Sequence, residues 1–176
     1  MIVATAGHVD HGKTSVIKQI TGVDTDRLDE EKKRGLSINL GYAFQQVSDG
    51  NVLGYIDVPG HKRFINTMIA GVSCIDLALI VVAADDGMMP QTIEHIEVLR
   101  LLGIRSYVLA VTKTDRVPKS RSIEVANEVL ELLGDSCPVF FVDNINAKGI
   151  IPLRDYLSLK AKTHKEKSDS GHFRLS

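Results

Sequence analysis

The sequence predicts an α/β domain on a mostly parallel six-stranded sheet, with one antiparallel edge hairpin and helices on both faces. Three observations support this prediction. Apolar runs of strand length alternate with longer segments of helical period. The run 76–84 shows no polar alternation, as expected for a parallel strand buried on both faces. Residues 48–51, Ser-Asp-Gly-Asn, form a turn signal between two strand-like runs, which indicates the antiparallel hairpin.

The predicted strands are the apolar or alternating runs that turn signals bound. In chain order they cover residues 2–6, 41–47, 52–56, 76–84, 106–111 and 139–142. The first strand leads directly into a glycine-rich loop. The second and third form the hairpin, and each later strand is separated from the next by a predicted helix, which favours parallel pairing.

The predicted helices cover residues 13–21, 62–70, 91–102, 120–133 and 152–160. Gly22 and Gly71 are predicted to end the first two helices. In the third, the apolar side chains at positions 93, 96, 99 and 102 recur at helical spacing, and a glycine follows at 103. Ser120 or Ser122 is the expected N-cap of the fourth, and Pro152 suits the first turn of the last. The charged stretch 24–34 shows no period.

Composition excludes several classes of protein. The chain has 176 residues, a length that fits one domain, and 21 basic against 22 acidic residues leave no basic footprint for sequence-independent nucleic-acid binding. No apolar run is long enough to span a membrane and no signal peptide is recognisable, so we expect a cytoplasmic protein. Cys74 and Cys137 lie far apart and are expected to be buried reduced thiols.

The chain divides into one domain and a short tail. Residues 1–162 are predicted to form the α/β domain. Residues 163–171 are polar and rich in Ser and Lys, which predicts a linker. Residues 172–176 regain strand-like alternation and are expected to begin a further domain.

A phosphate-binding loop is the strongest chemical signal. Residues 7–14, Gly-His-Val-Asp-His-Gly-Lys-Thr, fit the pattern G-x-x-x-x-G-K-[ST] between a strand and a helix. Gly7 and Gly12 let the backbone wrap a phosphate with its N–H groups turned inward. Lys13 supplies a charge for the β- and γ-phosphates, and the Thr14 hydroxyl is placed to bind Mg²⁺. The predicted contacts of the loop with a nucleotide come from Gly7, His8, Val9, Asp10, His11, Gly12, Lys13, Thr14 and Ser15.

Two further motifs follow predicted strands. Asp57 can hold Mg²⁺ through water, and the backbone N–H of Gly60 can reach a γ-phosphate. In Thr112-Lys113-Thr114-Asp115, the Asp115 carboxylate can accept hydrogen bonds from N1–H and the N2 amino group of guanine, donors that adenine lacks. The aliphatic stem of Lys113 can lie along the base plane. His61, directly after Gly60, can orient a water for attack on phosphorus.

The order of these motifs identifies the chain as a member of the Ras-like P-loop GTPases. The spellings of residues 7–14, 57–61 and 89–95 resemble the translational GTPases, elongation factor Tu and its relatives. Residues 22–28 and 30–41 most closely resemble the bacterial selenocysteine-specific elongation factors. The resemblance covers residues 1 to about 160, and residues 172–176 resemble the start of the family's next, β-barrel domain.

The resemblance implies roles for particular residues. Ser37 stands where the family usually has a threonine that binds Mg²⁺, so Thr14, Ser37 and Asp57 are the implied metal residues. Thr112 stands where most GTPases have asparagine, as in the selenocysteine-specific factors. His61 is the implied catalytic histidine, aligned by the ribosome, and Asp10 is implied near a monovalent cation.

One position departs from the family. Its Ser-Ala or Thr-Ala element, whose backbone N–H meets guanine O6, is replaced here by Val142-Asp143-Asn144. Asp143 and Asn144 are therefore expected at the base, and an acidic side chain there is unfavourable unless it points away.

The resemblance implies a monomeric GTPase domain of a factor that delivers selenocysteyl-tRNA to the ribosome and recognises an mRNA hairpin. Another translational GTPase, such as a general elongation or initiation factor, remains an alternative. So does a nucleotide-gated binding module with negligible turnover. Asp115 and the lack of a lid segment argue against a P-loop kinase.

Overall fold

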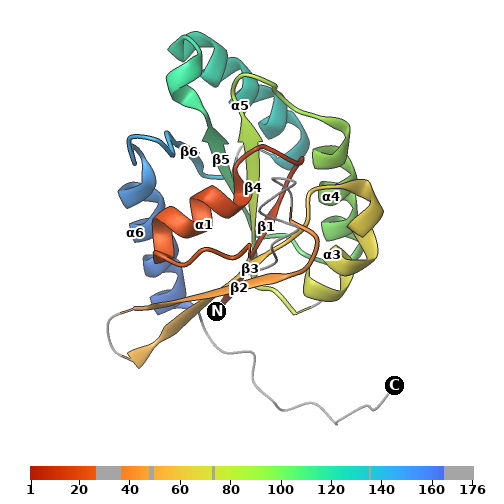
Figure 1. The fold of residues 1–176 in the computed structure, drawn as a ribbon, viewed down its shortest axis with the longest axis vertical. Helices are drawn as coiled ribbons and strands as arrows, with labels where there is room; N and C mark the ends of the chain where they lie inside the picture. The colour runs from red at the N-terminus through yellow and green to blue at the C-terminus, as the bar shows by residue number, and fades with distance from the viewer. Residues whose placement is uncertain (27–36, 48–49, 73, 135, 165–176) are drawn as a thin grey trace.

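The computed structural model describes residues 1–26, 37–47, 50–72, 74–134 and 136–164, and its main feature is one mixed sheet (Figure 1). Within these residues, six strands lie in the order β2-β3-β1-β4-β5-β6. They are β1 (Ile2–Ala6), β2 (Gly41–Gln46), β3 (Val52–Asp57), β4 (Leu77–Ala83), β5 (Tyr107–Thr112) and β6 (Val139–Phe141). β2 runs antiparallel to β3, and every other neighbouring pair is parallel. The predicted fold class is confirmed.

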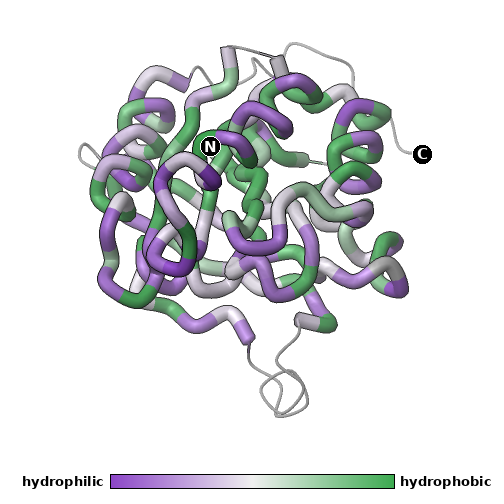
Figure 2. The backbone as a smooth tube through the Cα atoms, turned by 90° about the horizontal axis from the view of Figure 1, so that it is seen from above, coloured by the Kyte–Doolittle hydropathy of each residue, from purple (hydrophilic) through white to green (hydrophobic). Residues whose placement is uncertain are grey.

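Helices cover both faces of this sheet (Figure 1). On one face α1 (Lys13–Thr21) and α6 (Ile150–Thr163) pack over one hydrophobic core. On the other face α3 (Ile65–Val72), α4 (Pro90–Leu101) and α5 (Lys119–Leu133) pack over a second core. Two short 3₁₀ turns, η2 (Lys62–Phe64) and η3 (Thr114–Arg116), precede α3 and α5. Seen from above, the hydrophobic segments gather in the middle of the molecule, and the helices around them alternate in hydropathy (Figure 2).

The central strand β4 separates the two cores. All of its residues are buried, and successive side chains enter opposite cores, so that Leu79 lies in one and Ile80 in the other. This explains why the run lacks polar alternation, because neither of its faces meets water. Every strand boundary agrees with its prediction to within one residue.

The helix boundaries differ more, for local reasons. Gly71 does not end a helix: it lies inside α3, where a Cβ would come within 2.6 Å of a Leu40 methyl carbon. The predicted serine N-cap of α5 is wrong, because the helix begins at Lys119 after Pro118. Ser122 is instead a buried residue within that helix.

The last helix is longer than predicted. α6 begins at Ile150 because Gly149, in the left-handed conformation with φ 76°, directs the chain into it. It ends at Thr163, which the sequence placed in the linker. The prediction that both thiols are buried is correct for Cys137 and wrong for Cys74, which is exposed.

Part of the predicted organisation lies outside the described residues. This applies to 165–171 of the linker, to the strand-like segment 172–176, and to 27–34 of the charged stretch. Among the helices that the structure describes, none is both long and apolar enough to cross a membrane.

Candidate nucleotide site

The predicted motifs meet at one edge of the sheet. The phosphate loop follows β1, Asp57 ends β3, and Thr112 ends β5. The carboxyl ends of these parallel strands lie at the same edge, and β1 sits between β3 and β4, where the direction of winding changes. In open α/β sheets this is the position where ligands bind.

The phosphate loop adopts the conformation that its glycines predict. Gly7 has φ 140° and Gly12 has φ 87°, both in the region that favours glycine. A Cβ on Gly7 would lie 2.2 Å from the carbonyl oxygen of Val81, so no side chain fits there. Asp10 also has a positive φ, of 61°, at the exposed tip of the loop.

Helix α4 holds the first residues of this loop. The backbone N–H of Gly7 donates to His95 Nδ1 at 3.1 Å, and that of His8 donates to Thr92 Oγ1 at 3.2 Å. The His8 ring also contacts Gln91 Oε1 through its Nδ1. Burial, with Lys13 and His8 nearby, lowers the pKa of His95 to about 4, which keeps its ring neutral and Nδ1 available as an acceptor.

Lys13 is buried beside the loop backbone. Its Nζ donates to the carbonyl oxygen of His8 at 2.8 Å. Burial lowers the pKa of Lys13 to about 8, against the opposing influence of carboxylates that include Asp57 and Asp10. Gly60 packs against the same amine, since a Cβ at Gly60 would lie 2.4 Å from Lys13 Nζ.

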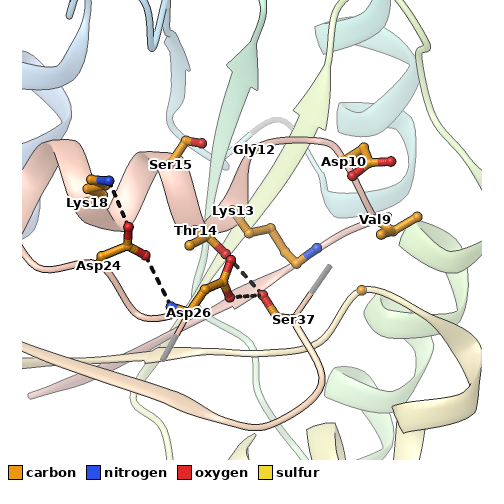
Figure 3. Close-up of a pocket in the computed structure, with 11 residues that line it drawn as sticks. Val9, Asp10, Gly12, Lys13, Thr14, Ser15, Lys18, Asp24, Asp26 and Ser37 are labelled. Carbon is orange, nitrogen blue, oxygen red and sulfur yellow. Dashed lines mark hydrogen bonds and ion pairs between the residues drawn. The ribbon is translucent and has the colours of Figure 1, made fainter. Parts of the chain in front are cut away.

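A cavity of about 320 Å³ opens along one side of the phosphate loop (Figure 3). Thr14 Oγ1 and Ser37 Oγ lie 3.1 Å apart within it, and Ser37 Oγ donates to Asp26 Oδ1 at 2.7 Å. The structure thus brings together the two hydroxyls predicted to hold Mg²⁺. The lining residues are Val9, Asp10, Gly12, Lys13, Thr14, Ser15, Lys18, Asp24, Asp26, Ser37 and Gly60.

Asp57, the third predicted metal residue, is buried at the end of β3 and does not line this cavity. Its Oδ1 accepts a hydrogen bond from the Thr5 hydroxyl at 2.8 Å, and its Oδ2 accepts one from the Thr25 hydroxyl at 2.6 Å. These two bonds fix the carboxylate and link β3 to β1 and to the segment after α1.

A second cavity, of about 220 Å³, is lined by three of the predicted base-binding residues, Lys113, Asp115 and Asn144, but not by Thr112 or Asp143. Its lining residues are Asp10, Gly12, Ser15, Lys113, Asp115, Arg116, Asn144 and Ile145. Asp10, Gly12 and Ser15 line both cavities, so the two adjoin along the phosphate loop. Thr112 joins this end to the loop, because its hydroxyl donates to the His11 carbonyl oxygen at 2.7 Å.

His11 lies between the two ends of the site, fully buried. Neither of its ring nitrogens has a hydrogen-bond partner among the described residues, and Nε2 lies 3.8 Å from Asp86 Oδ2. Burial lowers its pKa to about 4, so this ring is neutral at pH 7.

The acidic side chain of Asp143 turns away from the base-binding cavity. Its Oδ1 accepts the backbone N–H groups of Ile145 and Asn146 at 2.9 and 3.0 Å, and its Oδ2 accepts the Asn146 amide. The Asn146 bonds hold its pKa below the ordinary value. Asn144, by contrast, faces the loop: its Nδ2 would lie 3.0 Å from a Cβ on Gly12.

His61 is the one predicted catalytic residue that lines neither cavity. Its Nδ1 accepts the backbone N–H of Arg63 at 3.2 Å, and its ring stacks edge-on to Phe64, with 6.2 Å between centroids. The structure therefore places His61 next to Gly60 and turned toward η2.

Sequence reasoning missed the residues that support the site from other elements. Thr92 and His95 are polar residues on the buried face of α4, beside Ile96 and Leu99, and that pattern is a usable signal. Thr25 and Asp26 lie in a stretch without period, and no sequence signal marked their contacts with Asp57 and Ser37.

Comparison with known proteins agrees with this geometry. Residues 1–163 match the family described as the elongation factor Tu GTP binding domain. The chain belongs to this family. Members of the family hydrolyse GTP, and the chain is accordingly a translational GTPase domain.

Within the family, the resemblance to selenocysteine-specific elongation factors is confirmed. The chain is 50% identical to the Escherichia coli factor over 161 residues, covering 89% of the chain and 26% of the relative. It is 45% identical to the Desulfomicrobium baculatum factor, covering 99% of the chain and 28% of the relative. A crystal structure of a bacterial selenocysteine-specific elongation factor superposes with a TM-score of 0.87 at 41% identity, covering 94% of the chain and 29% of that protein. The chain thus spans about a quarter of the length of these relatives.

Proposed function

We propose that this chain binds GTP and Mg²⁺, hydrolyses GTP when the ribosome stimulates it, and acts as the nucleotide switch of a selenocysteyl-tRNA delivery factor. The observation that supports the first step is the pair of adjoining cavities along the phosphate loop. The first is lined by two lysines and by the three hydroxyl residues Thr14, Ser15 and Ser37, and the second by Asp115.

The polyphosphate lies along the loop between Val9 and Thr14. Backbone N–H groups and Lys13 hold its oxygens, while the N–H groups of Gly7 and His8 are already engaged with α4. The side-chain atoms of Thr14, Ser37 and Asp26 that could bind a metal ion are all oxygens, and Mg²⁺ prefers oxygen ligands.

Thr14 and Ser37 would hold the metal directly, with Asp57 acting through water. Mg²⁺ bound there would neutralise charge on the phosphate oxygens during the reaction. The exposed carboxylate of Asp10 at the loop tip suits an additional monovalent cation.

The base lies in the second cavity. Asp115 accepts guanine N1–H and the N2 amino group, and the Lys113 stem lies along the base plane. Thr112 fixes the position of the loop, and the backbone of Asp143 and Asn144 meets the O6 edge. Because the Asp143 carboxylate accepts hydrogen bonds from its own loop, it points away from the guanine base, and the expected repulsion between them is removed.

Hydrolysis needs a water in line with the γ-phosphorus. Its oxygen bonds to phosphorus as the bond from phosphorus to the bridging oxygen breaks, which releases GDP and phosphate. Because His61 Nδ1 is engaged with Arg63, its Nε2 is the atom that orients this water. The ribosome supplies the alignment of the His61 segment that this requires.

GTP brings Ser37 and Gly60 to the γ-phosphate, and hydrolysis releases them. This switch controls selenocysteyl-tRNA binding by a monomeric cytoplasmic factor that also recognises an mRNA hairpin. Identities of 45–50% to two such factors support this role over that of a general elongation or initiation factor. The GTP domain extends to the end of α6 at Thr163, one residue beyond the predicted boundary at 162.

The proposal is tested first on nucleotide binding and turnover. The chain should bind fluorescent GDP and a GTP analogue but not ATP, and Lys13→Ala should weaken the binding of both guanine nucleotides. Slow GTP hydrolysis should require Mg²⁺. If ATP competes as well as GTP, the proposed base recognition is wrong.

A chimera tests the role in translation. The chain would replace the GTP domain of the Escherichia coli selenocysteine-specific factor, to which it is 50% identical. We expect the chimera to retain selenocysteyl-tRNA over seryl-tRNA in the GTP state and to hydrolyse GTP faster on ribosomes. His61→Ala should leave GTP binding within a few-fold and cut stimulated hydrolysis by about 10²–10⁴. A folded, GTP-binding chimera without tRNA retention would contradict the assigned role.

A further inference from the structure

A network of four charged side chains lies beside the base-binding cavity. Asp85 and Asp86 follow β4, while Lys113 caps the turn η3 after the neighbouring strand β5 and Arg116 ends that turn. Lys113 Nζ lies 3.0 Å from Asp86 Oδ2 and 3.3 Å from Asp85 Oδ1. Arg116 NH1 lies 3.0 Å from Asp85 Oδ2. Both cations near the base are therefore paired with carboxylates from another loop.

Asp115 stands between these two cations in sequence. It is exposed, and no described residue forms an ion pair or hydrogen bond with its carboxylate in the structure. Arg116 is its direct neighbour, and Lys113 precedes it by two residues. Asp115 is thus the carboxylate nearest in sequence to both cations, although they pair with Asp85 and Asp86 instead.

The network also constrains the backbone. Lys113 has φ 53° and caps η3 in the left-handed conformation, which a lysine rarely adopts. Its side chain is only 19% exposed. Desolvation raises the pKa of Asp85, but hydrogen bonds from Arg116 and Lys113 outweigh it and hold that pKa below its ordinary value. Asp85 therefore stays ionised throughout the physiological range.

We propose that Asp85 and Asp86 are positioning residues for guanine recognition, because they hold Lys113 and Arg116 away from Asp115 and leave its carboxylate free for the base. The same pairs fix the Lys113 stem beside the base plane. This inference rests on the proposed role of Asp115. It predicts that the two acidic residues set the preference for guanine and not merely the overall affinity.

The test compares GDP with IDP, which lacks the 2-amino group and offers Asp115 one donor fewer. In the unaltered chain GDP should bind about 10- to 100-fold more tightly, the value of one hydrogen bond to a charged group. In Asp85→Asn/Asp86→Asn this ratio should fall by about three- to tenfold, because Lys113 and Arg116 then occupy Asp115. The ratio is the informative quantity, since removing negative charge also changes phosphate affinity for both nucleotides.

Three further variants sharpen the test. Asp155→Asn removes a carboxylate paired with Arg154 on α6 and should leave the ratio unchanged. Arg116→Ala in the Asp85→Asn background should restore part of the ratio. If the double variant does not fold, Asp86→Asn alone, whose side chain is 46% exposed, provides the comparison.

Equal weakening of GDP and IDP, or an unchanged ratio, would overturn the inference and leave Asp85 and Asp86 with a structural role only. Asp115→Ala distinguishes a failure of the positioning role of Asp85 and Asp86 from a failure of base recognition by Asp115. If it lowers the ratio while the Asp85 and Asp86 variants do not, only the present inference fails. If it too leaves the ratio unchanged, the assignment of Asp115 to the base fails, and the inference with it.

Discussion

Substituting Thr92 by valine tests whether helix α4 holds the phosphate loop. Thr92 is fully buried, and its hydroxyl accepts the backbone N–H of His8 at 3.2 Å. Valine has the same shape as threonine, so the change removes the acceptor without opening a cavity. The His8 N–H, which is only part-buried, then loses its one protein acceptor in the described structure.

The expected loss follows from that orphaned donor. A buried donor without a partner costs about 1–3 kcal/mol, and the partial burial and 3.2 Å length of this bond favour the lower half of that range. We expect the free energy of unfolding to fall by about 1–2 kcal/mol, a factor of about 5–30 in the ratio of folded to unfolded protein. GDP affinity should also fall, by up to about tenfold, because binding must then order the loop.

Urea unfolding and calorimetric GDP titration measure the two effects. Thr163→Val is the matched control: its hydroxyl bonds only within the exposed end of α6, so it should change stability by less than about 0.5 kcal/mol. If Thr92→Val and Thr163→Val cannot be distinguished in either measurement, α4 does not hold the loop, and the support assigned to Thr92 is wrong.

Three other changes probe the phosphate end of the site. Ser37→Ala should weaken a GTP analogue by about 1–3 kcal/mol and leave GDP nearly unchanged, because only the triphosphate needs this hydroxyl; equal losses in calorimetry would contradict its role. Gly60→Ala should cost the analogue about 1–3 kcal/mol, since the added Cβ would lie 2.4 Å from Lys13 Nζ, and the same calorimetry checks it. Bound phosphate favours the protonated Lys13 amine, whose pKa is about 8, so binding takes up a proton and affinity falls as the pH rises. GDP should bind about fourfold more weakly at pH 8.5 than at pH 7, and titrations in two buffers should detect the proton uptake.

The sequence predicted the fold well because the strands carry unambiguous patterns. β4 is buried on both faces and therefore has no polar residue, and the hairpin turn fixes the antiparallel edge. Helix ends were harder to predict, since tertiary contacts decide them. Gly71 looked like a helix end, but the structure uses its small size to let Leu40 pack against α3.

The residues of the site also fall into a group that the sequence predicts and a group that it does not. Residues within contiguous motifs, such as Lys13 and Thr14, were predicted because spacing alone implies their chemistry. Supporting residues were not, because they gain their role only through contacts between distant segments. His95 reaches Gly7 across 88 positions of sequence, and Thr25 reaches Asp57 across 32.

The central claim is that this chain recognises guanine through the Asp115 carboxylate, and a crossed titration tests it most directly. The unaltered chain and Asp115→Asn are each titrated with GTP and with xanthosine triphosphate. The amide accepts fewer hydrogen bonds than the carboxylate and offers a donor that suits xanthine O2. GTP should therefore weaken by about 10²–10⁴, from two charge-assisted bonds of ~1.5–3 kcal/mol each, while the xanthine nucleotide binds more tightly. Unchanged affinity for both nucleotides would contradict the account.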